Sequence, residues 1–143
     1  MNKSNIRLAK ILAYCGTLPL VASVLLIYAP VAGIDGSIIA ITYAAIIISF
    51  LCGMHWAIFL FFAEKCPHNL LVTSNIVALL AWSSLLVPHR GIAFVFQALC
   101  FIFLFMLDFK LHNAEIVPEW FYNTRRNATA IVVLCLAAMA VLS

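Results

Sequence analysis

The sequence predicts an all-α fold, an integral membrane bundle of five transmembrane helices that run up and down. Three observations predict it: the apolar segments, the composition and the placement of basic residues. The 143 residues contain five stretches without Asp, Glu, Lys or Arg. These are residues 11–34, 36–63, 69–87, 91–107 and 127–143. Because a helix needs about 20 mostly apolar residues to cross a bilayer, nearly the whole chain is predicted to form membrane helices.

The composition points the same way. Hydrophobic residues make up 66% of the chain and charged residues 9%, whereas soluble domains contain about 25% charged residues. A water-soluble fold would leave large apolar patches exposed and would associate through them. The net charge of +3 does not indicate nucleic-acid binding, because the basic residues do not gather on one polar face.

The basic residues predict the orientation in the membrane. With the N-terminus inside, the inner side holds seven of them and the outer side only Arg90. The seven are Lys3, Arg7, Lys10, Lys65, Lys110, Arg125 and Arg126. The positive-inside rule therefore predicts an inside N-terminus and an outside C-terminus, in a bacterial inner (cytoplasmic) membrane. A mitochondrial inner membrane is the alternative, although the N-terminus lacks an Arg- and Ser-rich transit peptide.

The first two helices are expected over residues 6–28 and 37–63. Pro19 predicts a kink in the first, because proline removes one backbone hydrogen bond. The second carries a strip of small residues at every fourth position, which lets two helices approach closely. The strip is Ala45, Ser49, Gly53 and Ala57. We expect it to pack inside the bundle, with docking of a partner protein as the alternative.

The other three helices are expected over residues 69–87, 92–111 and 118–142. Pro118 suits a first helical position, where its missing N–H costs nothing. The short connections predict antiparallel neighbours. No linker divides the chain, so residues 1–143 are predicted to form one domain.

His55 is the main candidate for chemistry. It precedes Glu64 by nine residues, which places it about 13 Å along the helix from that charge. An ionisable residue at membrane depth is a functional hypothesis by default. Histidine can bind metal or haem, relay protons or hold a ligand. The alternative is a neutral structural histidine that is hydrogen-bonded to a neighbouring helix.

Asp108 and Arg125 both lie at the predicted inner boundary, where they could pair across two helices. The alternative is that each anchors its helix at the interface by extending to water. Trp120 precedes the two arginines, as aromatic residues do in a membrane-interface belt. Gln97, Tyr14 and Asn75 are polar residues that we expect to hold helices together.

Motifs for catalysis are missing. The chain has no phosphate loop, H-E-x-x-H, G-x-S-x-G or C-x-x-C motif. Cys52 and His55 share a helix face, but no second Cys/His pair lies at ligand spacing, so no metal site is predicted. The sequence leaves any cofactor unknown, and it favours a protein that is not an enzyme.

Three segments resemble one family. They are Tyr14–Pro19 (YCGTLP), Tyr43–Trp56 (YAAIIISFLCGMHW) and Pro118–Arg125 (PEWFYNTR), the last following Asp108. Together they resemble small bacterial inner-membrane proteins of unknown function, related to the mitochondrial transmembrane protein sixty-nine. Cys52 and Thr124 depart from the glycine and leucine of its motifs. The resemblance implies a cluster of His55, Trp56, Asp108, Trp120 and Arg125.

Two functions are compatible with these observations. The first is an accessory or assembly partner of a larger membrane protein complex, embedded in the lipid bilayer. The second is a binding bundle for a hydrophobic or anionic small molecule, such as a porphyrin, quinone or lipid. Its pocket would lie in the inner half of the bundle, around His55, Trp56, Asp108, Trp120 and Arg125.

Overall fold

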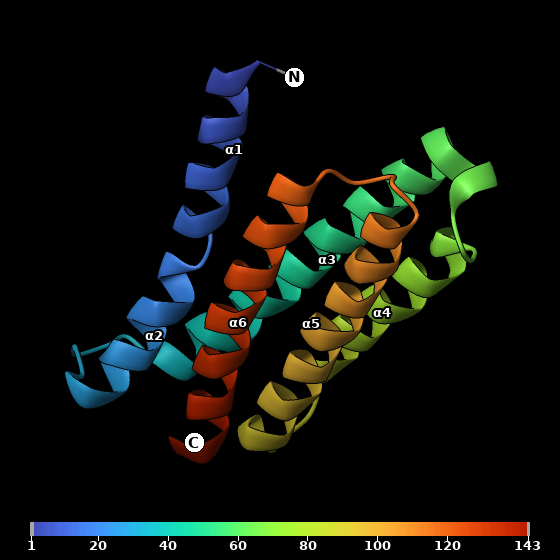
Figure 1. Ribbon diagram of the computed structural model, residues 1–143. Helices are drawn as coiled ribbons and strands as arrows, with labels where there is room; N and C mark the ends of the chain where they lie inside the picture. The colour runs from blue at the N-terminus through green and yellow to red at the C-terminus, as the bar shows by residue number, and fades with distance from the viewer. Residues whose placement is uncertain (1, 143) are drawn as a thin grey trace.

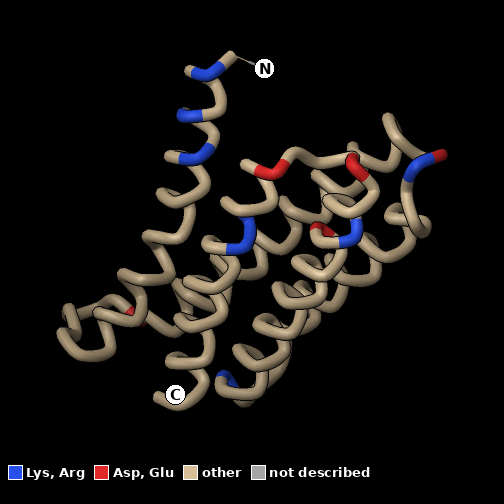
Figure 2. The backbone as a smooth tube through the Cα atoms, in the orientation of Figure 1, with Lys and Arg blue, Asp and Glu red and all other residues tan. Residues whose placement is uncertain are grey.

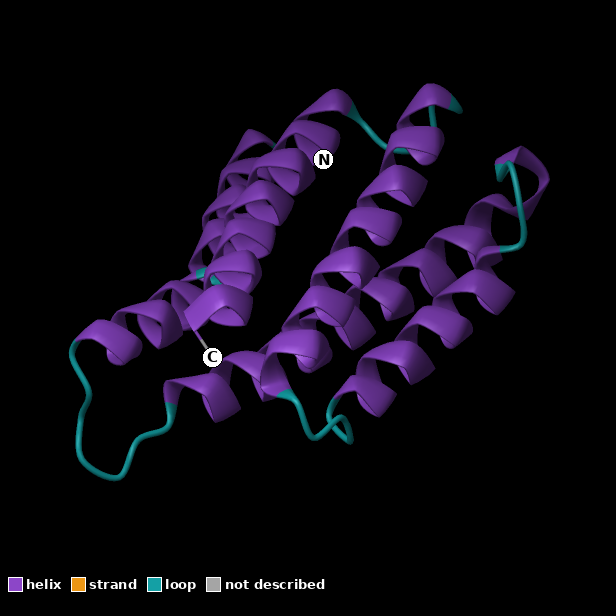
Figure 3. Cartoon of the chain, turned by 90° about the horizontal axis from the view of Figure 1, so that it is seen from below, coloured by secondary structure: helices purple, strands orange, loops and turns teal. Residues whose placement is uncertain are grey.

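The computed structural model describes residues 2–142, and every regular element in that range is helical (Figure 1). The elements are α1 (Lys3–Cys15), α2 (Leu18–Tyr28), α3 (Gly36–Phe62), a 3₁₀ turn η1 (Ala63–Lys65), α4 (Leu70–Ser84), α5 (Arg90–Asn113) and α6 (Glu119–Leu142). The connections between them are short, as the teal segments of Figure 3 show. The predicted all-α class is confirmed.

The helices pack side by side, with α3 and α5 in the middle. α5 lies against α6 and α4, and α3 lies against α2, α4 and α5. The N- and C-termini lie at opposite ends of the bundle (Figure 1). The largest side chains that are fully buried in this core include Ile48, Phe94, Phe101, Leu104, Leu136 and Met139.

The first predicted helix, 6–28, is two helices in the structure. The helix is interrupted at Gly16 and Thr17. Pro19 lies in the first turn of α2, where its missing N–H removes no helical hydrogen bond. The Tyr43 hydroxyl donates to the Gly16 carbonyl at 2.8 Å, which holds the break against α3. The predicted kink at Pro19 was therefore misplaced, since the proline begins a helix and does not bend one.

Among residues 2–142, four segments are long and apolar enough to cross a membrane: Lys3–Tyr28, Gly36–Lys65, Arg90–Asn113 and Glu119–Leu142. The remaining helix, α4, has only 15 residues. It stops at Ser84, short of the predicted residue 87, because Leu85 to Val87 form tighter turns before Pro88. Pro88 disfavours the helical conformation at Val87, so the helix has to end before the proline.

The small-residue strip of α3 does not pack inside the chain as expected. Ala45 is buried, but Ser49, Gly53 and Ala57 are exposed. A Cβ added at Gly53 would meet no atom within 4 Å. The inward side of α3 instead carries Ala44, Ile48, Leu51, Cys52 and His55. The expectation of packing within the chain was wrong for the last three residues of the strip.

The turn between α2 and α3 depends on two glycines. Gly33 has φ +81°, a left-handed conformation that other residues adopt only with strain. Gly36 packs so closely that an added Cβ would lie 2.7 Å from the Ser23 carbonyl oxygen. Between them, Asp35 caps α3 by accepting from the backbone N–H groups of Ser37 and Ile38.

The charged residues divide between the two ends. Figure 2 shows basic positions along α1, in η1, near the end of α5 and near the start of α6, and one at the opposite end, where α5 begins at Arg90. There Arg90 donates to Asp35 at 2.7 Å, in a pair whose side chains are 45% and 43% exposed. That ion pair ties the start of α5 to the start of α3.

Candidate functional site

A buried ion cluster joins three helices in the half of the bundle near the N-terminal end. His55 on α3 and Asp108 on α5 are both 0% exposed, and Nε2 of His55 lies 2.7 Å from Oδ1 of Asp108. Arg125 on α6 donates from Nε to Oδ2 of Asp108 at 2.8 Å. Both oxygens of one carboxylate are therefore engaged, and the two partners come from different helices.

Helical periodicity brings these three residues inward. On α3, His55 follows Ile48 and Leu51 on the buried side, and on α5, Asp108 follows Phe101 and Leu104 in the same way. Residues three, four and seven positions apart share one face of a helix. The polar groups thus continue apolar stripes that the core already buries, which forces them to find partners within the protein.

The charges of Asp108 and Arg125 balance one another. A buried charge is tolerated only when it is paired and hydrogen-bonded. Nε2 of His55 is hydrogen-bonded to Oδ1 of Asp108, and Nδ1 of His55 has no hydrogen-bond partner among residues 2–142.

The two predicted tryptophans lie outside this cluster. Trp56 follows His55 but is 41% exposed, because the next residue on a helix points to a different side. Trp120 is half-buried and its ring contacts Phe121 edge to face. Within residues 2–142, neither ring is hydrogen-bonded to His55, Asp108 or Arg125. The structure brings together three of the five residues that the sequence singled out.

A cavity of about 220 Å³ lies beside the cluster. Apolar side chains from α1, α3, α5 and α6 line most of it, together with Arg125 and Thr129. Two buried polar atoms of these residues, Arg125 Nη2 and Thr129 Oγ1, have no hydrogen-bond partner among the described residues. The sequence analysis missed Thr129, although its position four residues after Arg125 places it on the same face of α6.

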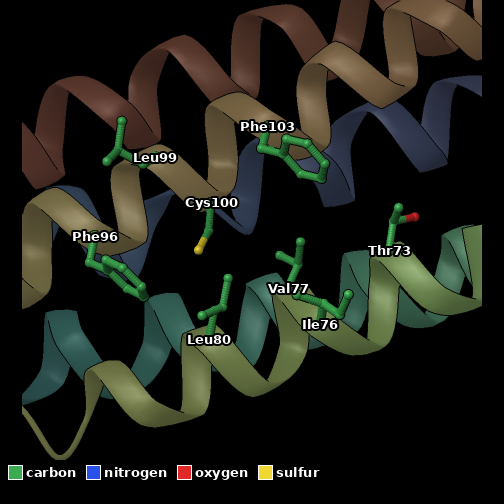
Figure 4. A pocket seen from close by; sticks show the side chains of 8 residues that line it. All are labelled: Thr73, Ile76, Val77, Leu80, Phe96, Leu99, Cys100 and Phe103. Atoms are coloured by element: carbon green, nitrogen blue, oxygen red, sulfur yellow. The ribbon is translucent and has the colours of Figure 1, made fainter.

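A second hollow, of about 300 Å³, lies between α4 and α5 (Figure 4). Figure 4 shows Phe96 and Cys100 of α5 pointing toward α4, where Leu80 and Val77 lie. The Thr73 hydroxyl at its edge bonds to carbonyls of its own helix. Since no charged residue lines this hollow, it offers a ligand apolar contact and little else.

Polar residues outside the ion cluster bear on two further properties, metal binding and the linkage of helices. Within residues 2–142, no three of His, Cys, Asp and Glu gather closely enough to hold a metal ion. Gln97 joins three helices by donating to the Ile41 carbonyl at 2.8 Å and to the Ser84 hydroxyl at 2.9 Å. Tyr14 accepts from Asn127 across α1 and α6, whereas Asn75 bonds to its own helix.

Comparison with known proteins places this arrangement in a family. No curated protein and no solved structure matches the chain. The family model described as "Protein of unknown function (DUF3429)" matches residues 5–141, which include α2 to α5, nearly all of α1 and α6 and all three residues of the ion cluster. Because this match covers almost the entire sequence, the chain belongs to the DUF3429 family of proteins of unknown function.

Proposed function

We propose that this protein is a membrane-embedded helical bundle that binds a hydrophobic or anionic small molecule beside His55, Asp108 and Arg125. It would bind and hold the molecule and would not be an enzyme. The four long apolar segments support residence in a bilayer. Burying ionisable groups inside a membrane protein is costly in free energy, and such groups mark sites of function.

One observation carries the proposal, namely that Arg125 belongs both to the ion cluster and to the wall of the cavity. Its Nε neutralises Asp108, and its Nη2 has no partner among residues 2–142. A cation that served only to balance Asp108 would not also need to line a cavity. The arrangement favours a ligand that contacts the same guanidinium.

The basic residues support an orientation with the N-terminus inside, in a bacterial inner membrane. Seven of the eight Lys and Arg residues would lie on the inner side, which is the bias that the positive-inside rule describes. In that orientation the ion cluster lies near the inner leaflet, and the Asp35–Arg90 pair lies at the outer surface.

The exposed strip of α3 favours a second candidate function, an accessory or assembly partner of a larger membrane complex. Ser49, Gly53 and Ala57 face away from the bundle, and the space around Gly53 is open. Small residues at this spacing let a helix of another protein approach closely. Gly53→Leu would then abolish co-purification of the partner, whereas retained co-purification would contradict this candidate.

Native mass spectrometry after mild extraction from the cell's own membrane tests both candidates. A reproducible small-molecule adduct supports the binding bundle, and an added polypeptide supports the accessory role. A bare protein contradicts both. His55→Ala should weaken retention of the small molecule, with His55→Asn as a milder variant if folding suffers. His68→Ala, a histidine of the loop before α4, is the matched control and should retain it.

A further inference from the structure

We infer that the cavity beside Arg125 binds a single-chain lipid anion, with its oxyanion head held by Arg125 Nη2 and Thr129 Oγ1. This inference rests on the proposed function and names its ligand class. The polar atoms, the apolar lining and the size of the cavity favour this ligand class over a porphyrin.

Two buried polar atoms that have no partner among residues 2–142 would bind the head of the ligand. Thr129 is 5% exposed, and the Arg125 side chain is 11% exposed, so water reaches neither freely. Leaving a buried donor without an acceptor is unfavourable, and more so for a charged group. Arg125 Nη2 can only donate, and Thr129 Oγ1 can donate. Their common complement is an acceptor, and an anionic oxygen is the strongest one.

The rest of the cavity wall would contact the tail of the ligand. Below Thr129 on the same face of α6 lies Val132, and across from them are Phe101 and Leu51. Leu12 of α1 lines another side, and α1 has no buried residues. An aliphatic chain would leave the cavity along α1 and continue among the acyl chains of the bilayer.

The size of the cavity limits the choice of ligand. Its volume of about 220 Å³ equals that of roughly seven liquid waters. Drug-sized ligands occupy pockets of about 300–1,000 Å³, so the cavity is small for a porphyrin ring. One compact head group and the first part of one chain would fit.

Binding to purified protein in a non-ionic detergent tests this inference. The probes are oleate, oleyl phosphate and the uncharged oleyl alcohol, each titrated and counted as a one-to-one adduct by native mass spectrometry. We expect both anions to bind at least tenfold more tightly than the alcohol. The tighter of the two anions distinguishes a free fatty acid from a phosphate head, and either order supports the inference. Equal binding of the alcohol overturns it.

Thr129→Val provides the sharpest variant because it removes the hydroxyl, nearly preserves the side-chain volume and leaves the ion cluster intact. We expect it to weaken oleate binding about tenfold. Thr124→Val is the matched control, since Thr124 is equally buried on α6 but its hydroxyl bonds to the Trp120 carbonyl at 2.7 Å. Oleate binding that is unchanged in Thr129→Val overturns the inference.

Protoporphyrin and a short-chain quinone separate this inference from the proposed function. If either binds in a manner that depends on His55 while oleate does not, the ligand class is wrong and the binding bundle stands. If none of the probes binds and no adduct survives extraction, the binding function itself fails.

Discussion

His55 and Asp108 are separated by 53 residues in the chain, and their side chains meet at 2.7 Å in a part of the bundle where neither is exposed. Arg125 completes the cluster from a third helix. This contact fixes the rotation of α3 against α5, because a small turn of either helix would bring an ionisable group into apolar surroundings. The cluster therefore specifies how the helices pack as well as offering a site.

Removing the shared carboxylate should destabilise the bundle strongly. Asp108→Ala leaves the Arg125 charge buried without a counter-ion, which typically costs about 3–5 kcal/mol. Unfolding in mixed micelles with increasing SDS, followed by circular dichroism, measures the loss. Adding Arg125→Ala to Asp108→Ala should recover part of it, because the unpaired charge is gone. Strict additivity of the two variants would show that the pair is not coupled.

Two glycine substitutions should differ although both lie in α3. Gly36→Ala places a Cβ 2.7 Å from the Ser23 carbonyl oxygen and should lower stability by about 1–3 kcal/mol. Gly53→Ala meets no atom within 4 Å, and alanine favours a helix by about 1 kcal/mol, so stability should hold or rise. Thermal unfolding in detergent compares them, and similar effects would contradict the close packing of α2 on α3.

The amide of Gln97 should contribute more to stability than that of Asn75. Gln97→Leu removes two hydrogen bonds that cross to α3 and α4 and should cost about 1 kcal/mol. Asn75→Leu removes one bond to the Leu71 carbonyl of its own helix, on an exposed side, and should change little. The same denaturation assay measures both. If Asn75→Leu proved the more damaging, Gln97 would not be a linker of helices.

The ion pair at the other end should respond to acid. The hydrogen bond from Arg90 holds the pKa of Asp35 below its ordinary value of 3.8, and the capping N–H groups of Ser37 and Ile38 lower it further. A depressed pKa means stability that is present above pH 3.8 and lost as the pH falls through the lower, folded value. Because both side chains are well exposed, we expect the pair to contribute under about 1 kcal/mol to the free energy of unfolding.

Stability measured between pH 5 and pH 2 in Arg90→Gln and in the wild type checks this contribution. The wild type should lose more stability over that range than the variant does. Parallel curves would show that the pair contributes nothing, and high salt should bring the two curves together.

Cysteine labelling should report the orientation of the bundle. Cys66 lies between η1 and α4, on the side that would be inside. Burial raises the pKa of its thiol, so labelling should be slow at neutral pH and faster at pH 8.5. An impermeant maleimide should label it in inverted vesicles and not in intact cells. A variant with Cys66→Ser and Val31→Cys should instead be labelled in intact cells and not in inverted vesicles. Labelling of Cys66 from outside would show that the orientation is the reverse of the one proposed.

The sequence predicted the helices well because their signal is local. Charge-free apolar stretches give the existence and approximate ends of α3, α5 and α6, and the conformational limits of proline and glycine explain most of the remaining differences. Pro19 was misread because the same residue is compatible with a kink and with a helix start. Only the neighbouring Gly16 and Thr17, held by Tyr43, decide between them.

The site was predicted in part because depth along a helix can be counted but rotation cannot. Counting from Glu64 and comparing helix ends placed His55, Asp108 and Arg125 in the inner half of the bundle. Rotation put His55 inside and Trp56 outside, and it turned the small residues of α3 away from the core. An apolar chain gives weak hydrophobic periodicity, since lipid-facing and buried positions hold the same residue types. Thr129 had no sequence signal apart from its spacing from Arg125.

The shortness of α4 has a consequence for the surrounding lipid. Its 15 residues extend about 22 Å, whereas the hydrocarbon core of a bilayer is about 30 Å thick. A membrane that surrounds the bundle would have to thin beside α4, while the longer α3 and α5 require its full depth or a tilt. The two sides of the molecule thus have unequal hydrophobic thickness, and such mismatch favours thinner membranes and neighbours that relieve it.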